Sequence, residues 1–174
     1  MFTKEDNKIF LDDNFNKDLS TIDLSDIDTI IFGEEFNQPL YHLPKHIKKI
    51  KLHCYFNQPL DLLHEGLEEI VFDITNQCFQ YDLLHLPTSL RVLKLSFFYN
   101  KFFHQLPENI EVLRMPYWYT HQWNLPPKLK MLLLPLSPPP IKIWNNEYNK
   151  YRKKKSKIDF VDMSNDEDFY QTIT

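Results

Sequence analysis

A short block of sequence recurs at intervals of about twenty residues, and this repetition decides the fold class. The string Phe-Asn-Gln-Pro-Leu at residues 36–40 returns at residues 56–60, and weaker copies begin at Phe15, Phe79 and Tyr99. Most copies are followed by a Leu-Pro pair, as at residues 43–44. A unit this small cannot bury its own apolar face, so the units must stack and share one core.

Each unit also contains two apolar residues separated by a single position, which is the alternation expected of a half-buried strand. One short strand per unit predicts a mainly β solenoid, a leucine-rich-repeat-like parallel stack of about seven strands. The pairs are Ile9/Leu11, Ile30/Phe32, Ile50/Leu52, Ile70/Phe72, Leu93/Leu95, Leu113/Met115 and Leu132/Leu134.

The composition excludes several classes of protein. The 174 residues are 43% hydrophobic, enough for one domain with a core, and 24 acidic residues against 20 basic ones argue against a nucleic-acid binder that is positively charged overall. Two glycines, Gly33 and Gly66, cannot build a phosphate-binding loop. No apolar run is long enough to span a membrane, and Cys54 and Cys78 are expected as free thiols in a reducing, cytoplasmic compartment.

The Phe-Asn-Gln-Pro-Leu block followed by Leu-Pro resembles the FNIP repeat, a relative of the leucine-rich repeat in amoebal and giant-virus proteins. The resemblance covers roughly residues 9 to 136, with full blocks at Phe36 and Phe56. It implies a leucine-rich-repeat-like fold and an interaction role, without catalytic residues, in the host cytoplasm if the protein is viral. Many members carry an F-box ahead of the repeats, and only eight residues precede Ile9 here.

The first two residues of each block have predicted structural roles. The aromatic residues are expected to stack along a spine, because equivalent positions lie about one strand spacing apart. The asparagines are expected to hydrogen-bond backbone in successive turns, with Gln80 as a longer substitute. The spine comprises Phe15, Phe36, Phe56, Phe79 and Tyr99, and the amide ladder comprises Asn16, Asn37, Asn57 and Asn100.

The position between the two apolar residues of each pair is expected to lie on an exposed strand face. In the middle of the stack this position is Lys51, Lys94 and Arg114, and Lys49 lies just before one pair. We expect these four residues to contact an acidic protein segment or a phosphate-bearing partner. The alternative is a solvated face whose charges only keep the sheet soluble.

The histidines and cysteines do not predict a catalytic or metal site. His42 and His85 lie two units apart, about 10 Å by strand counting and too far to share one zinc ion. His53 and Cys54 are expected to point to opposite faces, as neighbours on a strand do. We therefore predict no catalytic residue, no cofactor and no metal.

The repeats end at residue 136, which divides the chain into a solenoid at residues 1–136 and two further segments. Residues 137–158 are expected to form a Pro-rich break and a basic capping helix, and residues 159–174 an acidic, frayed tail. The basic residues could contact nucleic acid or an anionic surface, although a solvated helix end is the simpler interpretation. They are Arg152, Lys153, Lys154, Lys155 and Lys157.

Taken together, these patterns predict a non-enzymatic protein-protein interaction module that binds through the exposed strand face. One alternative is a substrate-recognition adaptor in ubiquitin transfer, which follows only from the resemblance. A second alternative is contact of the basic segment with nucleic acid or an anionic surface. The sequence leaves the partner and the oligomeric state open.

Overall fold

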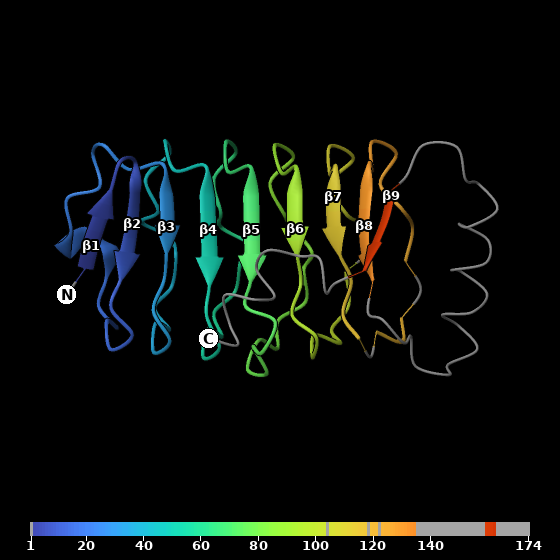
Figure 1. Cartoon of the computed structure of the whole chain (residues 1–174), viewed down its shortest axis with the longest axis horizontal. Coiled ribbons are helices and arrows are strands. Elements are labelled where there is room, and N and C mark those ends of the chain that lie inside the picture. The colour runs from blue at the N-terminus through green and yellow to red at the C-terminus, as the bar shows by residue number, and fades with distance from the viewer. Residues whose placement is uncertain (1, 104, 118, 122, 135–158, 163–174) are drawn as a thin grey trace.

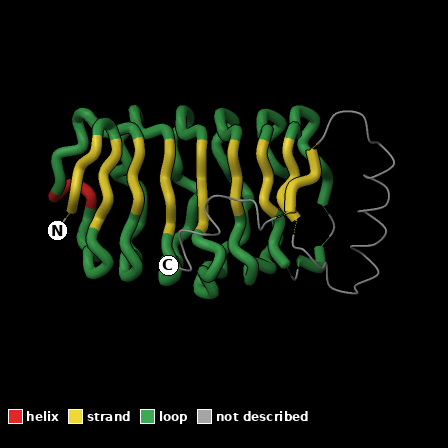
Figure 2. Tube along the Cα trace, viewed as in Figure 1, coloured by secondary structure: helices red, strands yellow, loops and turns green. Residues whose placement is uncertain are grey.

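The computed structural model describes residues 2–103, 105–117, 119–121, 123–134 and 159–162. These residues form one sheet of nine strands that lie in a single row, with the connecting segments turning back at both edges (Figures 1 and 2). Strand order in the sheet follows strand order in the chain. The strands are β1 (Phe2–Glu5), β2 (Lys8–Leu11), β3 (Thr29–Ile31), β4 (Lys49–Leu52), β5 (Glu69–Phe72), β6 (Val92–Lys94), β7 (Val112–Arg114), β8 (Met131–Leu134) and β9 (Asp159–Asp162).

The strands from β2 to β8 pair in parallel, one strand per repeat, which confirms the predicted parallel stack of seven strands. The pairing register joins equivalent residues of successive units: Ile30 pairs with Ile50, and Ile50 with Ile70. A parallel strand needs a crossover connection before the next strand can begin. Here the remainder of each repeat is that connection.

The core lies between the strands and the returning segments of the repeats. In each unit the strand supplies inward apolar side chains, and the repeat block supplies an aromatic ring that packs against them. The ring centroids of Phe32 and Phe36 are 4.1 Å apart, and those of Phe72 and Phe79 are 4.7 Å apart. The buried side chains form one continuous cluster from Ile9 to Leu132, so each unit depends on its neighbours.

Gly33 marks a close approach between two connecting segments. A side-chain carbon at this position would lie 2.2 Å from the carbonyl oxygen of Asp12 and 2.6 Å from Cα of Asp13. Both atoms belong to the backbone of the preceding unit, which cannot move aside easily. The absent side chain at Gly33 therefore allows the first two repeats to stack closely.

Two strands at the ends of the sheet were not predicted. β1 pairs antiparallel with β2 through a tight turn at Asp6, where φ is 52°, a conformation that aspartate tolerates better than most residues. β9 pairs in parallel with β8, so residues 159–162 form a strand where a frayed tail was expected. The proposed capping helix, the basic residues 152–157 and the remainder of the tail lie outside the described residues.

Candidate functional site

The aromatic residues of the repeat block stack from one unit to the next. The centroid distances are 6.3 Å for Phe15 and Phe36, 6.2 Å for Phe36 and Phe56, and 6.3 Å for Phe56 and Phe79. Tyr99 continues the row at 5.7 Å from Phe79. The rings are buried, so this spine belongs to the core and presents no binding surface.

The asparagines that follow these rings link each turn to the next. The backbone N–H of Asn37 donates to Oδ1 of Asn16 at 3.0 Å, and that of Asn57 donates to Oδ1 of Asn37 at 2.8 Å. The N–H of Gln80 donates to Oδ1 of Asn57 at 3.0 Å, and that of Thr120 to Oδ1 of Asn100 at 3.1 Å. The amide row therefore satisfies backbone donors that have no sheet partner.

Three of the four basic residues predicted on an exposed strand face are buried. The exposed fraction is 8% for Lys51, 9% for Lys94 and 0% for Arg114. Lys49 is half-buried and forms an ion pair with Glu69, with 3.1 Å between Nζ and Oε2. The predicted exposure of these residues, whether to a partner or to solvent, is therefore wrong for Lys51, Lys94 and Arg114, and Lys49 is the accessible member of the set.

Arg114 shows why a charged side chain can be buried at this position. Its Nε donates to the backbone carbonyl of Leu95 at 2.9 Å, and its Nη2 donates to the carbonyl of Phe72. One guanidinium thus bridges the ends of strands in neighbouring units. Burial of a cation is tolerated because carbonyl oxygens accept its hydrogen bonds.

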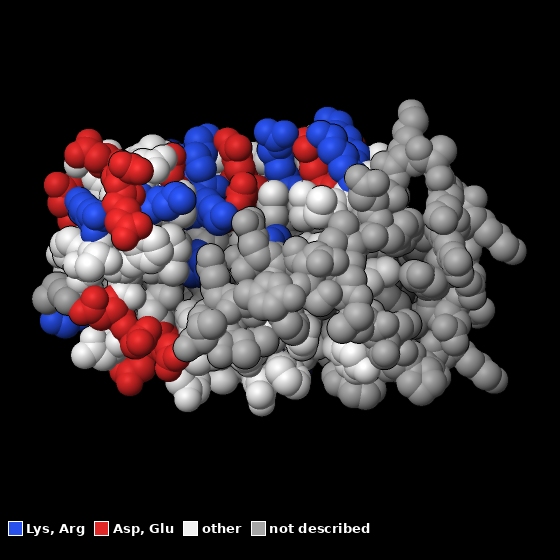
Figure 3. Space-filling view, viewed as in Figure 1, with Lys and Arg blue, Asp and Glu red and all other residues white. Residues whose placement is uncertain are grey.

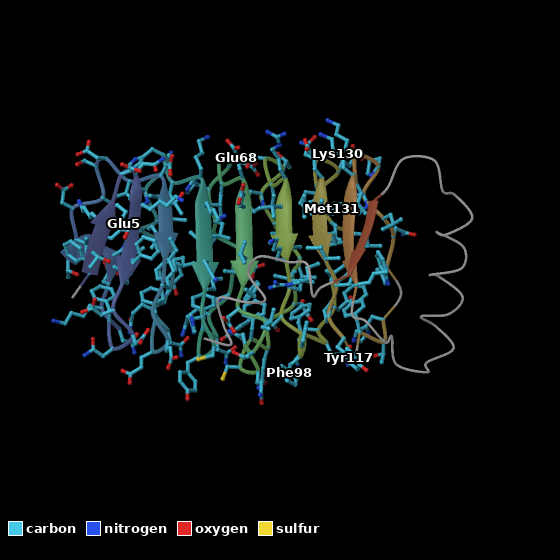
Figure 4. All side chains as sticks on the ribbon, in the orientation of Figure 1. Glu5, Glu68, Phe98, Tyr117, Lys130 and Met131 are labelled. Atoms are coloured by element: carbon cyan, nitrogen blue, oxygen red, sulfur yellow. The ribbon has the colours of Figure 1, made fainter. Side chains whose placement is uncertain are left out.

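Charged side chains of alternating sign line the edge of the sheet where the parallel strands begin, the upper edge in Figure 3. Nζ of Lys48 lies 3.0 Å from Glu68, and the carboxylate of Glu111 lies 2.8 Å from Arg91 and 2.6 Å from Lys130. Figure 4 shows Glu68 and Lys130 projecting from this edge. The hydrogen bonds from Lys130 and Arg91 lower the pKa of the Glu111 carboxyl below its usual value.

Large apolar side chains are exposed on the connecting segments of four successive units. They include Tyr41, with 55% of its surface exposed, and Leu62, with 70%. Tyrosine, phenylalanine and tryptophan are enriched in the centres of protein interfaces. The set comprises Tyr41, Tyr55, Leu62, Tyr81, Leu84, Phe98 and Phe102 and is called the coil patch below.

One group of metal-ligating side chains lies close together among the described residues. A carboxylate oxygen of Glu34, a ring nitrogen of His53 and Sγ of Cys54 all lie within 4.8 Å of one another. The sequence argument placed His53 and Cys54 on opposite faces of a strand, but β4 ends at Leu52. Alternation does not apply in the turn that follows, so both side chains can face the same space.

Sequence reasoning also missed the charged edge and the coil patch. The charged edge has a visible signal, because Lys48, Glu68, Arg91, Glu111 and Lys130 occupy equivalent positions one residue before each strand. The coil patch has no comparable signal, since its members occupy different positions within the repeat. Only the packing of the connecting segments decides which apolar side chains remain outside.

The strand pairing and the shared core define a short, leucine-rich-repeat-like parallel β solenoid. The sequence matches no family model and no curated protein. Among solved structures, the chain is similar to CroV588, described as a novel circular leucine-rich-repeat protein, with a TM-score of 0.49 and 21% sequence identity. The similarity covers 77% of this chain and 28% of that one, so this chain spans little more than a quarter of CroV588. Membership of the FNIP family remains a prediction.

Within the residues that the structure describes, no helix is long and apolar enough to cross a membrane.

Proposed function

We propose that this protein is a non-enzymatic scaffold that binds another protein through the coil patch. The observation that carries the proposal is the exposure of Tyr41, Leu62 and Leu84 on three successive connecting segments of a rigid stack. The stacking of repeats places successive connecting segments side by side, so one partner can contact several units at once. Burial of exposed apolar area supplies the favourable free energy of such a contact.

The charged edge is a weaker candidate for the contact. Lys48, Arg91 and Lys130 are already paired with acidic neighbours, so a partner would have to compete with existing ion pairs. A partner that approaches the strand face would meet Lys49, which is partly accessible but paired with Glu69. Contact at Lys49 therefore stays a second hypothesis, because Lys51, Lys94 and Arg114 are too buried to touch a partner directly.

Two further roles follow from the sequence alone. The adaptor role in ubiquitin transfer rests on the resemblance to the FNIP repeat. Contact with nucleic acid or an anionic surface rests on residues 152–157, which lie outside the described residues. Deleting residues 152–157 should abolish salt-sensitive binding if that contact is real.

The test compares the full chain with three variants in affinity capture followed by mass spectrometry. The first variant carries Tyr41→Ser, Leu62→Ser and Leu84→Ser and removes one exposed apolar side chain from each of three successive connecting segments. The second carries Lys48→Gln, Glu68→Gln and Lys130→Gln and alters the charged edge without changing apolar area. The third carries Lys49→Glu. Circular dichroism of each variant establishes that it is folded.

We expect the coil-patch variant to lose its protein partner and the charged-edge variant to retain it. Loss of the partner only in the Lys49→Glu variant would move the contact to the strand face. Retention of the partner by the folded coil-patch variant would contradict the proposal.

A further inference from the structure

The Glu34, His53 and Cys54 side chains are brought together by the parallel pairing of two strands. Glu34 follows β3, and His53 and Cys54 follow β4. Because β3 and β4 are parallel neighbours, the turns after them leave the sheet at the same edge, the lower edge in Figure 1. Residues that are about twenty positions apart in sequence therefore meet in adjacent turns.

The three candidate ligand atoms lie close enough together to bind a single metal ion after small movements of their side chains. They lie within 4.8 Å of one another. In a tetrahedral site with metal–ligand bonds of about 2.0–2.3 Å, neighbouring ligand atoms are about 3.3–3.8 Å apart. Glu34 is exposed, and His53 and Cys54 are partly buried, so an ion could enter from solvent and small side-chain rotations could complete the site.

The His53 ring is arranged as a metal-binding histidine often is. Its Nε2 lies 3.7 Å from Oδ2 of Asp73, whose side chain is almost completely buried. Its Nδ1 is buried and has no hydrogen-bond partner. Metal-ligating histidines commonly direct one ring nitrogen at a carboxylate while the other donates its lone pair to the metal.

Asp73 itself is held in place by its own turn. Its Oδ1 accepts hydrogen bonds from the backbone N–H of Thr75 at 2.8 Å and from the Thr75 hydroxyl at 2.5 Å. The remaining oxygen faces His53. A fixed carboxylate beside a histidine orients the ring and makes it a stronger ligand.

We propose that Glu34, His53 and Cys54 bind one divalent transition-metal ion of the zinc class, with Asp73 positioning His53. A thiolate, an imidazole and a carboxylate are all established zinc ligands, whereas calcium and magnesium prefer oxygen ligands alone. Three protein ligands leave a fourth position for water or for a group on a partner. The ion would join the turns of two successive units.

The electrostatic environment of Cys54 fits a cation at this place. A carboxylate oxygen of Glu34 lies within 4.8 Å of the Cys54 sulfur, and the almost completely buried carboxylate of Asp73 lies beside His53. A divalent cation would compensate these charges and hold the sulfur as a thiolate. Because both the thiol and the imidazole must be deprotonated to bind, affinity should fall as the pH is lowered.

The experiment uses cobalt(II) as the probe, titrated into the reduced full-length chain. A tetrahedral cobalt site with one thiolate gives an absorption band from sulfur-to-metal charge transfer, together with visible bands. We expect saturation at one ion per chain, and displacement of cobalt by zinc should abolish the bands. Either metal should raise the melting temperature, because an ion that binds only the folded chain stabilises it.

Matched variants identify the ligands. Cys54→Ser should abolish the charge-transfer band, and His53→Gln and Glu34→Gln should weaken cobalt binding about tenfold or more. Asp73→Asn should weaken binding while the band remains. The controls are Cys78→Ser, which removes the other thiol, Glu35→Gln, which removes the neighbouring carboxylate, and His85→Gln, which removes an exposed histidine elsewhere.

All three controls should bind cobalt as the parent does. Absence of a thiolate band in the parent chain, or its persistence in the Cys54→Ser variant, would overturn the proposal. Equal weakening by Glu34→Gln and Glu35→Gln would show a diffuse attraction to acidic residues and would overturn it as well. Circular dichroism of each variant in the absence of metal separates loss of binding from loss of folding.

Discussion

The phenylalanine and the asparagine that follow each other in the repeat block have different structural roles. The phenylalanine side chain fills the core and contacts the rings above and below it, whereas the asparagine accepts a hydrogen bond from the next turn. Both interactions connect one unit to the next along the stack. Both residues therefore stabilise the interface between units, as expected of a solenoid, and the ring also packs against the strand side of its own unit.

Asn37→Ala should lower the free energy of unfolding by about 1–3 kcal/mol, the cost of leaving a partly buried donor without a partner. The change removes the acceptor of the Asn57 N–H at 2.8 Å and of the Gln58 side chain at 3.2 Å. Asn37→Asp keeps an acceptor oxygen and should be less destabilising. Urea denaturation followed by circular dichroism measures the free energy of unfolding of both variants. Equal stability of the alanine variant and the parent would contradict a stabilising role of the amide ladder.

Arg114→Met should destabilise the fold, because it leaves the carbonyls of Leu95 and Phe72 without a donor in a buried place. The expected cost is about 1–3 kcal/mol for each carbonyl. Arg114→Glu should cost more, since it buries an anion beside those same carbonyl oxygens. Thermal melting checks both variants, and an unchanged melting temperature for Arg114→Glu would mean that this position is solvent-accessible.

At the scale of the element, each of the five parallel strands from β4 to β8 is directly preceded by a charged residue of opposite sign to that of its neighbour. Lys48, Glu68, Arg91, Glu111 and Lys130 follow one another along the edge of the sheet. Like charges at adjacent strands would repel, so alternation lets strands of three or four residues pair without electrostatic strain. The same ion pairs favour the correct register over a slip by one residue.

Stability should decrease in acid as the carboxylates of this edge and of the turns are protonated. Hydrogen bonds lower the pKa of Glu111 in the folded chain from its usual 4.5, and backbone donors lower that of Glu65. A carboxyl with a lowered pKa in the folded state stabilises the fold above its unfolded pKa, and this stabilisation is lost as the pH falls through the folded value.

Melting temperatures between pH 7 and pH 3 test this expectation. Glu111→Gln should melt slightly below the parent at pH 7, and the difference should shrink towards pH 3. High salt should reduce the difference at pH 7, because this carboxylate is exposed to screening. A constant difference at all pH values would show that charge is not the cause.

At the scale of the whole molecule, all units share one core. A substitution in a central unit should therefore also destabilise the units on either side of it. Leu93 is fully buried in β6, where it pairs with Ile70 on one side and Leu113 on the other. Its truncation removes contacts in three units at once.

Leu93→Ala should therefore cost about 2–5 kcal/mol, as a buried leucine truncation does. Urea denaturation measures the loss, and Leu62→Ala, at a position that is 70% exposed, is the matched control with little expected effect. A Leu93→Ala variant as stable as the parent would show that the assignment of core positions is wrong.

The architecture could be predicted because its signals are local and repeated. The alternating pair Ile50/Leu52 and the block at Phe56 recur in phase, so one correct assignment determines the others. β1 and β9 lie outside this phase, and a strand of four residues carries too little pattern to predict without its partner. The burial of Lys51 and Arg114 was not predicted. The alternating pattern identifies which strand face a side chain lies on, but the exposure of that face depends on the backbone around it.

The sequence by itself determined the parallel stack, its register and the roles of the repeated phenylalanines and asparagines. These features depend on periodicity, and periodicity can be read along a single chain. Only the tertiary structure decided which side chains of neighbouring units meet, including the approach of Glu34 to His53 and Cys54 and the bonds from Arg114 to two carbonyls. The physical reason is that stacking places residues about twenty positions apart within contact distance, and the geometry of each turn then fixes where their side chains point.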